Sequence, residues 1–144
     1  MTEIRECTAE DFPEVFKLLP GLWPKKPLDE TRLRETYLRA LQSPNQAYLA
    51  ALEGDELVGF CSLSTKQSLW QEGPIGHLDE ILVVESARGQ GVGSRLLAEA
   101  QRLASSLGCR RIELDSAFSR ERAHQFYQQN GYENRAYLFS KELA

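Results

Sequence analysis

The stretch that decides the fold begins at residue 78 and reads LDEILVVESARGQGVGSRLL over residues 78–97. Residues 78–84 end in the apolar run Ile-Leu-Val-Val, which predicts a buried strand. From residue 92 to residue 107, apolar residues recur at spacings of three and four, which predicts a helix with one apolar face. Gly108 follows, where a left-handed helix cap is expected. The stretch therefore predicts a strand, a glycine-rich loop and a long helix.

The loop between this strand and this helix has the properties of an anion site. Glycines at 89, 91 and 93 let the backbone approach a ligand closely. Amide groups at a helix start lack intrahelical partners, and with the helix dipole they suit a phosphate. Arg88 adds a positive charge, and residues 89–93 include no acid. The pattern favours a phosphate site over a bare turn, with a spacing unlike that of a dinucleotide fingerprint or a P-loop.

Length and composition predict one domain that covers residues 1–144. The chain has 42% hydrophobic and 26% charged residues, which is ordinary for a globular protein. Its net charge of −4 argues against a nucleic-acid surface. Three scattered cysteines and two histidines predict free thiols and no metal site. Without a signal peptide or a membrane-spanning run, the expected location is the cytoplasm.

The remaining sequence predicts strands and helices that alternate in a fixed order. A polar loop is expected at residues 67–76, and a turn at residues 53–56 is expected to join two strands. Thr8 and Asp29 are expected to cap the first two helices, and Ser119 the last. The predicted strands are 4–6, 47–52, 57–64, 78–84, 111–115 and 136–141, and the predicted helices are 12–19, 30–42, 92–107 and a helix that ends at Gly131.

Two stretches of this sequence resemble the signatures of one enzyme superfamily. Residues 88–93, Arg-Gly-Gln-Gly-Val-Gly, match the pattern Gln/Arg-x-x-Gly-x-Gly/Ala of the GNAT superfamily of acyl-CoA-dependent N-acyltransferases. Residues 123–132 match its Ala-x-x-Phe-Tyr-x-x-x-Gly-Phe/Tyr stretch, although Arg120 stands where many members have Asn. Residues 22–23 and 137–141 are similar to some aminoglycoside 6′-N-acetyltransferases. The loop at 116–120 lacks the acidic run that those enzymes use for a polycation.

The resemblance implies an α/β fold and a cofactor. The expected sheet is mixed and mostly antiparallel, splayed between its fourth and fifth strands and flanked by about four helices. Acetyl-CoA is expected to enter the splay as co-substrate. The residues expected to hold it are Leu82, Val83, Val84, Arg88, Gly89, Gln90, Gly91, Val92, Gly93, Ser94, Arg122 and Phe126.

The chemistry implied is acetyl transfer to a primary amine of a small molecule, by direct attack in a ternary complex. Tyr127 matches the tyrosine that often protonates the departing thiolate as a general acid. Asp79 and Glu80 are the candidate bases, with His77 a third; adjacent strand residues face opposite sides, so at most one carboxylate is expected to face the cleft. Asp79 is slightly favoured, acting through water. The alternative is that both carboxylates are simply solvated or paired.

The acceptor is less defined than the cofactor. Trp23, Trp70 and Asp115 are candidate substrate contacts; for the two tryptophans the alternative is hydrophobic cover over the core. Partners expected are acetyl-CoA, a small amine and a second copy of the chain, with neither nucleic acid nor membrane. Two other functions stay open: a non-catalytic acyl-CoA-binding or regulatory protein, and a protein or peptide N-acetyltransferase.

Overall fold

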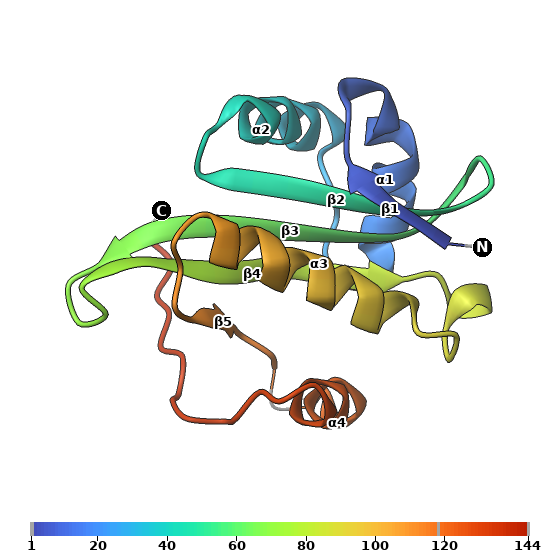
Figure 1. The fold of residues 1–144 in the computed structure, drawn as a ribbon. Helices are drawn as coiled ribbons and strands as arrows, with labels where there is room; N and C mark the ends of the chain where they lie inside the picture. The colour runs from blue at the N-terminus through green and yellow to red at the C-terminus, as the bar shows by residue number, and fades with distance from the viewer. Residues whose placement is uncertain (1, 118, 144) are drawn as a thin grey trace. The chain divides into compact units, whose positions relative to one another are not determined.

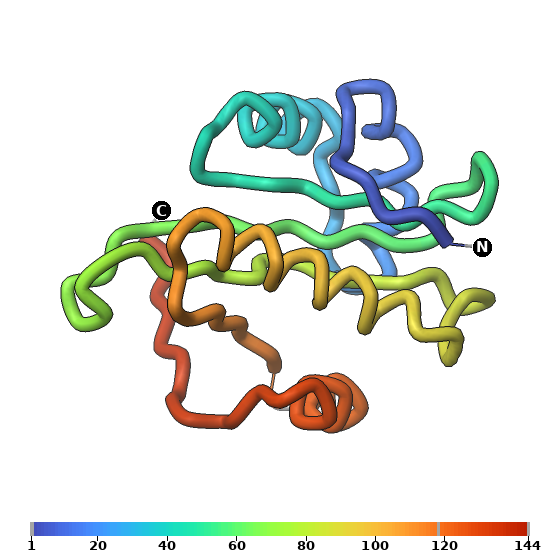
Figure 2. Tube along the Cα trace, viewed as in Figure 1, coloured from blue at the N-terminus to red at the C-terminus, as the bar shows by residue number. Residues whose placement is uncertain are grey.

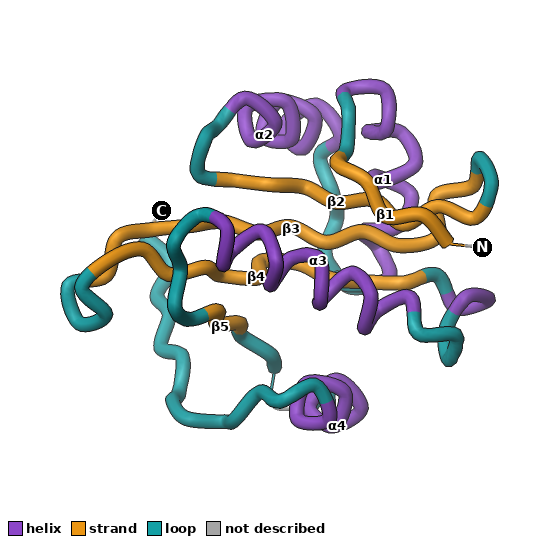
Figure 3. The backbone as a smooth tube through the Cα atoms, viewed as in Figure 1, coloured by secondary structure: helices purple, strands orange, loops and turns teal. Residues whose placement is uncertain are grey.

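The computed structural model describes residues 2–117 and 119–143, and the chain divides into two compact parts, residues 1–113 and 114–144. Figure 3 colours the helices, strands and loops of both parts. The helices are α1 (Phe12–Leu18), α2 (Glu30–Gln42), α3 (Val92–Ser106) and α4 (Glu121–Gln129), with short 3-10 helices η1 (Ala9–Asp11), η2 (Leu19–Gly21) and η3 (Glu85–Ala87). The strands are β1 (Thr2–Glu6), β2 (Gln46–Glu53), β3 (Glu56–Ser68), β4 (Gly73–Val83) and β5 (Ile112–Leu114).

The strands form one mixed sheet in the order β1-β2-β3-β4-β5, which confirms the predicted sheet (Figure 1). The first four pair antiparallel, and β5 runs parallel to β4. Arg111, just before β5, accepts a hydrogen bond at 2.9 Å from the amide of Gly76 in β4. The turn between β2 and β3 has Gly54 at a φ of 61°, as the hairpin pattern predicted.

The β3–β4 hairpin is longer than the sequence predicted. Residues 67–76, expected as a polar loop, continue both strands: Gln67 pairs with Pro74 and Ser68 with Gly73. A short turn closes the hairpin, with the amide of Glu72 donating to the carbonyl of Leu69 at 3.2 Å. The polar side chains led to a wrong prediction because strands pair through backbone N–H and C=O groups, not through side chains. Every residue here except proline supplies both groups.

One face of the sheet carries α1 and α2. Four rings stack from the helices to the strands, with centroids 5.3 Å apart for Phe12–Tyr37, 5.4 Å for Tyr37–Tyr48 and 5.4 Å for Tyr48–Phe60. Tyr48 and Phe60 come from β2 and β3, and on both sides of the pair Ala50–Phe60 the even-numbered residues of the two strands point to this face. Apolar side chains cover this face around Phe60, and further along β3 the face carries the polar side chains of Ser62 and Ser64.

The opposite face carries α3, whose apolar stripe was predicted. Leu96, Leu97 and Ala100 are at most 1% exposed. Gly59 on β3 lets the helix come close, because a Cβ there would lie 3.1 Å from Leu96 Cδ1. Gly108 follows the helix with a φ of 89°, which is the left-handed conformation expected of a residue that caps the end of a helix. In the described parts of the chain, no helix has both the length and the apolar content that a bilayer requires.

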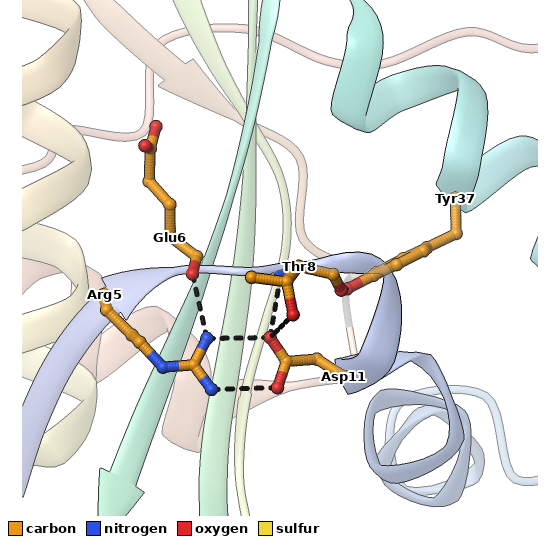
Figure 4. Close-up of polar contacts among 5 residues, drawn as sticks. All are labelled: Arg5, Glu6, Thr8, Asp11 and Tyr37. Atoms are coloured by element: carbon orange, nitrogen blue, oxygen red, sulfur yellow. Dashed lines mark hydrogen bonds and ion pairs between the residues drawn. The ribbon is translucent and has the colours of Figure 1, made fainter.

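A polar junction fixes where β1 gives way to the first helix (Figure 4). The Arg5 guanidinium donates to both oxygens of Asp11, at 2.7 and 2.9 Å, and the amide of Thr8 donates to Asp11 at 2.7 Å. These contacts hold the pKa of Asp11 below its usual value. The Tyr37 hydroxyl donates to the carbonyl of Thr8 at 2.7 Å, which connects α2 to the same turn. Asp29 caps α2 as expected, whereas Thr8 forms its capping box at the 3-10 helix η1, which leads into α1, and Asp11 is the N-cap of α1 itself.

The second part contains α4, and here two predictions are wrong. The helix is capped by Arg120, not Ser119, and it ends at Gln129 with Gly131 just beyond at a φ of 90°. The strand expected at residues 136–141 is not formed: the described residues 133–143 are assigned to no helix or strand. The apolar run at residues 136–139 favours a strand, but a strand also needs a partner for its backbone groups.

Candidate active site

The glycine-rich loop has the predicted strand–loop–helix geometry. The chain leaves β4 at Val83, passes through η3 and turns into α3, as Figure 2 traces in yellow. Gly89 and Gly91 have φ angles of 78° and 82°, a left-handed conformation that is energetically unfavourable for any residue with a Cβ atom. A Cβ built on either glycine meets no atom of the described chain within 4 Å. The backbone of this loop is therefore open on the side that a ligand would approach.

The helix that begins at this loop has amides at its start that precede its first hydrogen bond. The first helical hydrogen bond runs from the amide of Arg95 to the carbonyl of Gly91, at 3.0 Å. The amides of residues 92–94 precede that bond and lie at the positive end of α3. Arg88 is exposed, and its Nε donates to the carbonyl of Val83 at 3.1 Å, which ties the guanidinium to the end of β4. This is an arrangement suited to a phosphate.

A β-bulge in β4 changes which face of the sheet the side chain of Asp79 points to, relative to that of Glu80. Ser62 of β3 pairs with Glu80, but the next residue, Leu63, pairs with Leu78, so Asp79 is the extra residue of the bulge. Hydrogen bonds show the consequence: the hydroxyl of Ser62 donates to Glu80, and that of Ser64 donates to Asp79 at 3.1 Å. Ser62 and Ser64 are two positions apart and share a face.

The expectation that Asp79 and Glu80 face opposite sides is therefore wrong. Simple alternation fails at a bulge, because one inserted residue shifts the pleat. Both carboxylates accept from serines on the face that carries α1 and α2. The sequence carried one signal for this: Ser62 and Ser64 break an otherwise apolar strand at a spacing of two.

Glu80 is the more enclosed of the two acids. Its amide donates at 2.9 Å to the hydroxyl of Ser62, which is itself 0% exposed. Burial raises the pKa of Glu80, and the charge of Asp79 raises it further, while the Ser62 hydrogen bond opposes the shift. Tyr48 faces the same cluster: burial raises its pKa to about 12, and both carboxylates contribute. A carboxyl with a raised pKa is suited to proton transfer near neutral pH.

Asp79 has a partner that sequence reasoning did not assign. The Nδ1 atom of His77 lies 2.7 Å from an oxygen of Asp79, and the two side chains are 29% and 28% exposed. His77 pairs with Ser64 across the ladder, so His77 and Ser64 approach Asp79 together. Asp79 is thus held by two neighbours at the outer side of the cluster, while Glu80 lies deeper.

The remaining candidates in the first part are spread along the sheet. Leu82 and Val83 pair with Phe60 and Gly59 of β3, and the amide of Val84 donates to Val58 at 2.8 Å. Trp23 is half-buried against the core of the face that carries α1 and α2. Trp70 lies in the turn of the β3–β4 hairpin, 69% exposed, with Arg111 5.8 Å from its ring centroid.

The second part holds Asp115, Arg122, Phe126 and Tyr127. Asp115 and Arg122 are exposed. Tyr127 is 7% exposed and lies beside Phe126 and Tyr132, with ring centroids 5.4 and 6.1 Å away. Burial raises the pKa of Tyr127, and the nearby Arg120 guanidinium opposes that shift. Tyr127 therefore stays protonated at neutral pH, as a general acid must.

Comparison with known proteins decides the family. The model of the acetyltransferase (GNAT) family matches residues 2–132. The chain belongs to the GNAT acetyltransferase family. An aminoalkylphosphonate N-acetyltransferase of Salmonella typhimurium is 36% identical over 141 residues, which are 98% of this chain and 91% of that protein. An aminoglycoside N(6′)-acetyltransferase type 1 of the same organism is 28% identical over 134 residues, 91% of each.

A solved structure supports the same assignment. The aminoglycoside acetyltransferase AAC(6′)-Iy, in complex with a bisubstrate analogue of CoA, is similar with a TM-score of 0.85 and 25% identity, covering 99% of both chains. This GNAT protein is an N-acetyltransferase that uses acetyl-CoA as its co-substrate, which confirms the predicted enzyme class.

Proposed function

We propose that this GNAT enzyme acetylates the primary amine of a small molecule that also carries a phosphonate or phosphate group. The near full-length relative named for aminoalkylphosphonates supports the substrate class. The observation that carries the chemistry is the bulge, which sets Asp79 and Glu80 on one face of β4 beside Ser62 and Ser64. Two carboxylates on one face attract an ammonium group and can take its proton.

In the proposed reaction, Glu80 is the general base. It takes a proton from the acceptor ammonium, and the neutral nitrogen then attacks the thioester carbonyl of acetyl-CoA. The N–C bond forms, the C–S bond breaks, and the leaving thiolate takes the proton of the Tyr127 hydroxyl. The nitrogen gives up its second proton as the amide forms; an equivalent proton returns to Tyr127 from solvent, and Glu80 releases the first proton to solvent, so that one proton is released per turnover. Glu80 is preferred to Asp79, the residue that sequence alone favoured, because Asp79 is held by His77 while burial raises the pKa of Glu80.

The glycine-rich loop is proposed to hold the cofactor. The amides of residues 89–94 and the Arg88 guanidinium would bind the pyrophosphate, since the loop is open and lies at a helix start. Backbone groups of residues 82–84 would align the pantetheine arm. Arg122 and Phe126 are proposed to contact the cofactor from α4, and Trp23, Trp70 and Asp115 to contact the acceptor.

The larger organisation is also proposed rather than observed. The family match runs across both compact parts, which supports one domain over residues 1–144. A cytoplasmic homodimer is proposed. Four large apolar side chains of the C-terminal segment support the dimer, because they are 65–93% exposed: Tyr137, Leu138, Phe139 and Leu143. Sedimentation as a monomer at micromolar concentration would contradict it.

A second acceptor class has specific support. The 28% identical relative named for aminoglycosides and the solved complex with a bisubstrate analogue favour a polyamine sugar. The test is a panel assay of CoA release with thiol detection, using acetyl-CoA and 2-aminoethylphosphonate, kanamycin, n-propylamine or a short peptide. The proposal predicts the highest kcat/KM with 2-aminoethylphosphonate.

The other outcomes of the panel are informative. A preference for kanamycin or for the peptide would replace the substrate class. Acetyl-CoA binding in calorimetry without CoA release for any amine would indicate a binding protein instead of an enzyme.

A further inference from the structure

Lys66 extends the carboxylate cluster into a site with two charges of opposite sign. It is an exposed residue of β3, four positions beyond Ser62 and two beyond Ser64. Since side chains alternate along a strand, Lys66 shares the face on which Ser62 binds Glu80 and Ser64 binds Asp79. Across the ladder it pairs with Ile75, two residues before His77.

The position of Lys66 along the strand sets the distance between the charges. Residues two apart on one face of a strand are separated by about 7 Å. Lys66 therefore begins about 7 Å beyond the serine that holds Asp79, and its four-carbon stem can fold back toward the carboxylates. The ladder between β2 and β3 ends at the pair Gln46–Ser64, so Lys66 lies past the end of β2, and its own side chain is exposed although Ile75 opposite it is buried.

No other residue of these two strands carries such a charge. In β3 (Glu56–Ser68) and β4 (Gly73–Val83), Lys66 is the single lysine or arginine. Lys17, by contrast, is on the surface of α1 and is paired with Glu14 at 3.1 Å. This face of the sheet thus carries two carboxylates, at Ser62 and Ser64, and a cationic side chain at the next position of the strand that shares the face, Lys66.

We infer that Lys66 is a specificity-determining residue that binds the phosphonate or phosphate of the acceptor while its ammonium lies at Asp79 and Glu80. This inference rests on the proposed function. The ligand class is a short primary amine that carries a phosphoryl anion a few carbons away. A polycationic aminoglycoside would meet repulsion from the same lysine, so Lys66 separates the two candidate acceptor classes by charge.

The experiment measures kcat/KM for CoA release with three acceptors: 2-aminoethylphosphonate, O-phosphoethanolamine and n-propylamine. The variants are Lys66→Ala and Lys66→Gln, the second of which keeps much of the length without the charge. Lys17→Ala is the matched control, because it removes one equal charge from the same protein. Circular dichroism and thermal melting verify that each variant is folded.

The expected result is a loss confined to the charged acceptors. Either Lys66 variant should lower kcat/KM for both phosphoryl acceptors about 10- to 100-fold, mainly through KM, as the loss of one charge-assisted contact does. The value for n-propylamine should not change, and Lys17→Ala should match wild type throughout. The better of the two phosphoryl acceptors identifies the phosphonate or the phosphate ester as the natural group.

Other outcomes separate this inference from the proposed function. If wild type and Lys66→Ala prefer the phosphoryl acceptors over n-propylamine by the same factor, Lys66 does not bind the anion, although the proposed substrate class is retained. If wild type uses n-propylamine as well as 2-aminoethylphosphonate, no anion site exists. If none of the three amines supports CoA release by the wild-type protein, the proposed function itself fails.

Discussion

Gly89 and Gly91 allow the cost of backbone strain to be separated from the loss of cofactor binding. Both have positive φ angles, and a methyl group on either would touch no atom of the described chain within 4 Å. Replacing either with alanine should therefore cost only the left-handed backbone penalty, about 1–2 kcal/mol of unfolding free energy. If the loop holds the pyrophosphate as proposed, the same methyl group should weaken acetyl-CoA binding about tenfold or more, the equivalent of one lost hydrogen bond to a charged group.

Gly54 is the matched control for these variants. It has a φ of 61°, and a Cβ there also meets nothing within 4 Å, but it lies in the turn between β2 and β3. Gly54→Ala should lower the unfolding free energy as much as Gly89→Ala and Gly91→Ala in urea titrations, and leave acetyl-CoA affinity in calorimetry at the wild-type value. Equal affinity in all four proteins would refute the assignment of the cofactor to this loop.

Three further predictions concern single side chains. Tyr127→Phe should lower kcat about 100-fold and leave acetyl-CoA affinity unchanged, because only the general acid is lost; unchanged kcat across the pH range would exclude that role. Asp11→Ala should cost about 2 kcal/mol of unfolding free energy at pH 7 in urea titrations. Because Arg5 lowers the pKa of native Asp11, that stabilisation is complete above the unfolded pKa of about 3.9 and is lost as the pH falls through the lowered native value. Glu80→Gln should be more stable than wild type at pH 8 by a margin that shrinks toward pH 4, because a raised native pKa means that wild type loses stability as the pH rises through it.

The fold could be predicted from the sequence wherever the pattern was local. The strand, loop and helix around Gly91 follow from apolar spacing and glycine placement, and Asp29 follows from cap chemistry. Where pairing decides the outcome, prediction failed. Polar residues 67–76 form a hairpin because the backbone ladder continues through them, and residues 136–141 form no strand despite their apolar run.

The candidate site was predictable in its residues but not in its geometry. Asp79 and Glu80 were identified from the sequence, yet their shared face depends on which residue of β3 each one meets. A one-residue bulge reverses the pleat, and nothing in the residues 78–84 marks where it occurs. The contact between His77 and Asp79 was missed for the same reason.

The most direct test of the account is the pH dependence of kcat/KM in wild type, Glu80→Gln and Asp79→Asn, measured with the best acceptor of the panel. We expect an acidic limb in wild type with an apparent pKa above the ordinary glutamate value of about 4.3. Glu80→Gln should lose about 100-fold in activity together with that limb. In Asp79→Asn the limb should move to lower pH, because the charge that raises the pKa of Glu80 is gone. A Glu80→Gln enzyme with the wild-type rate and profile would contradict the central claim that Glu80 takes the proton of the acceptor.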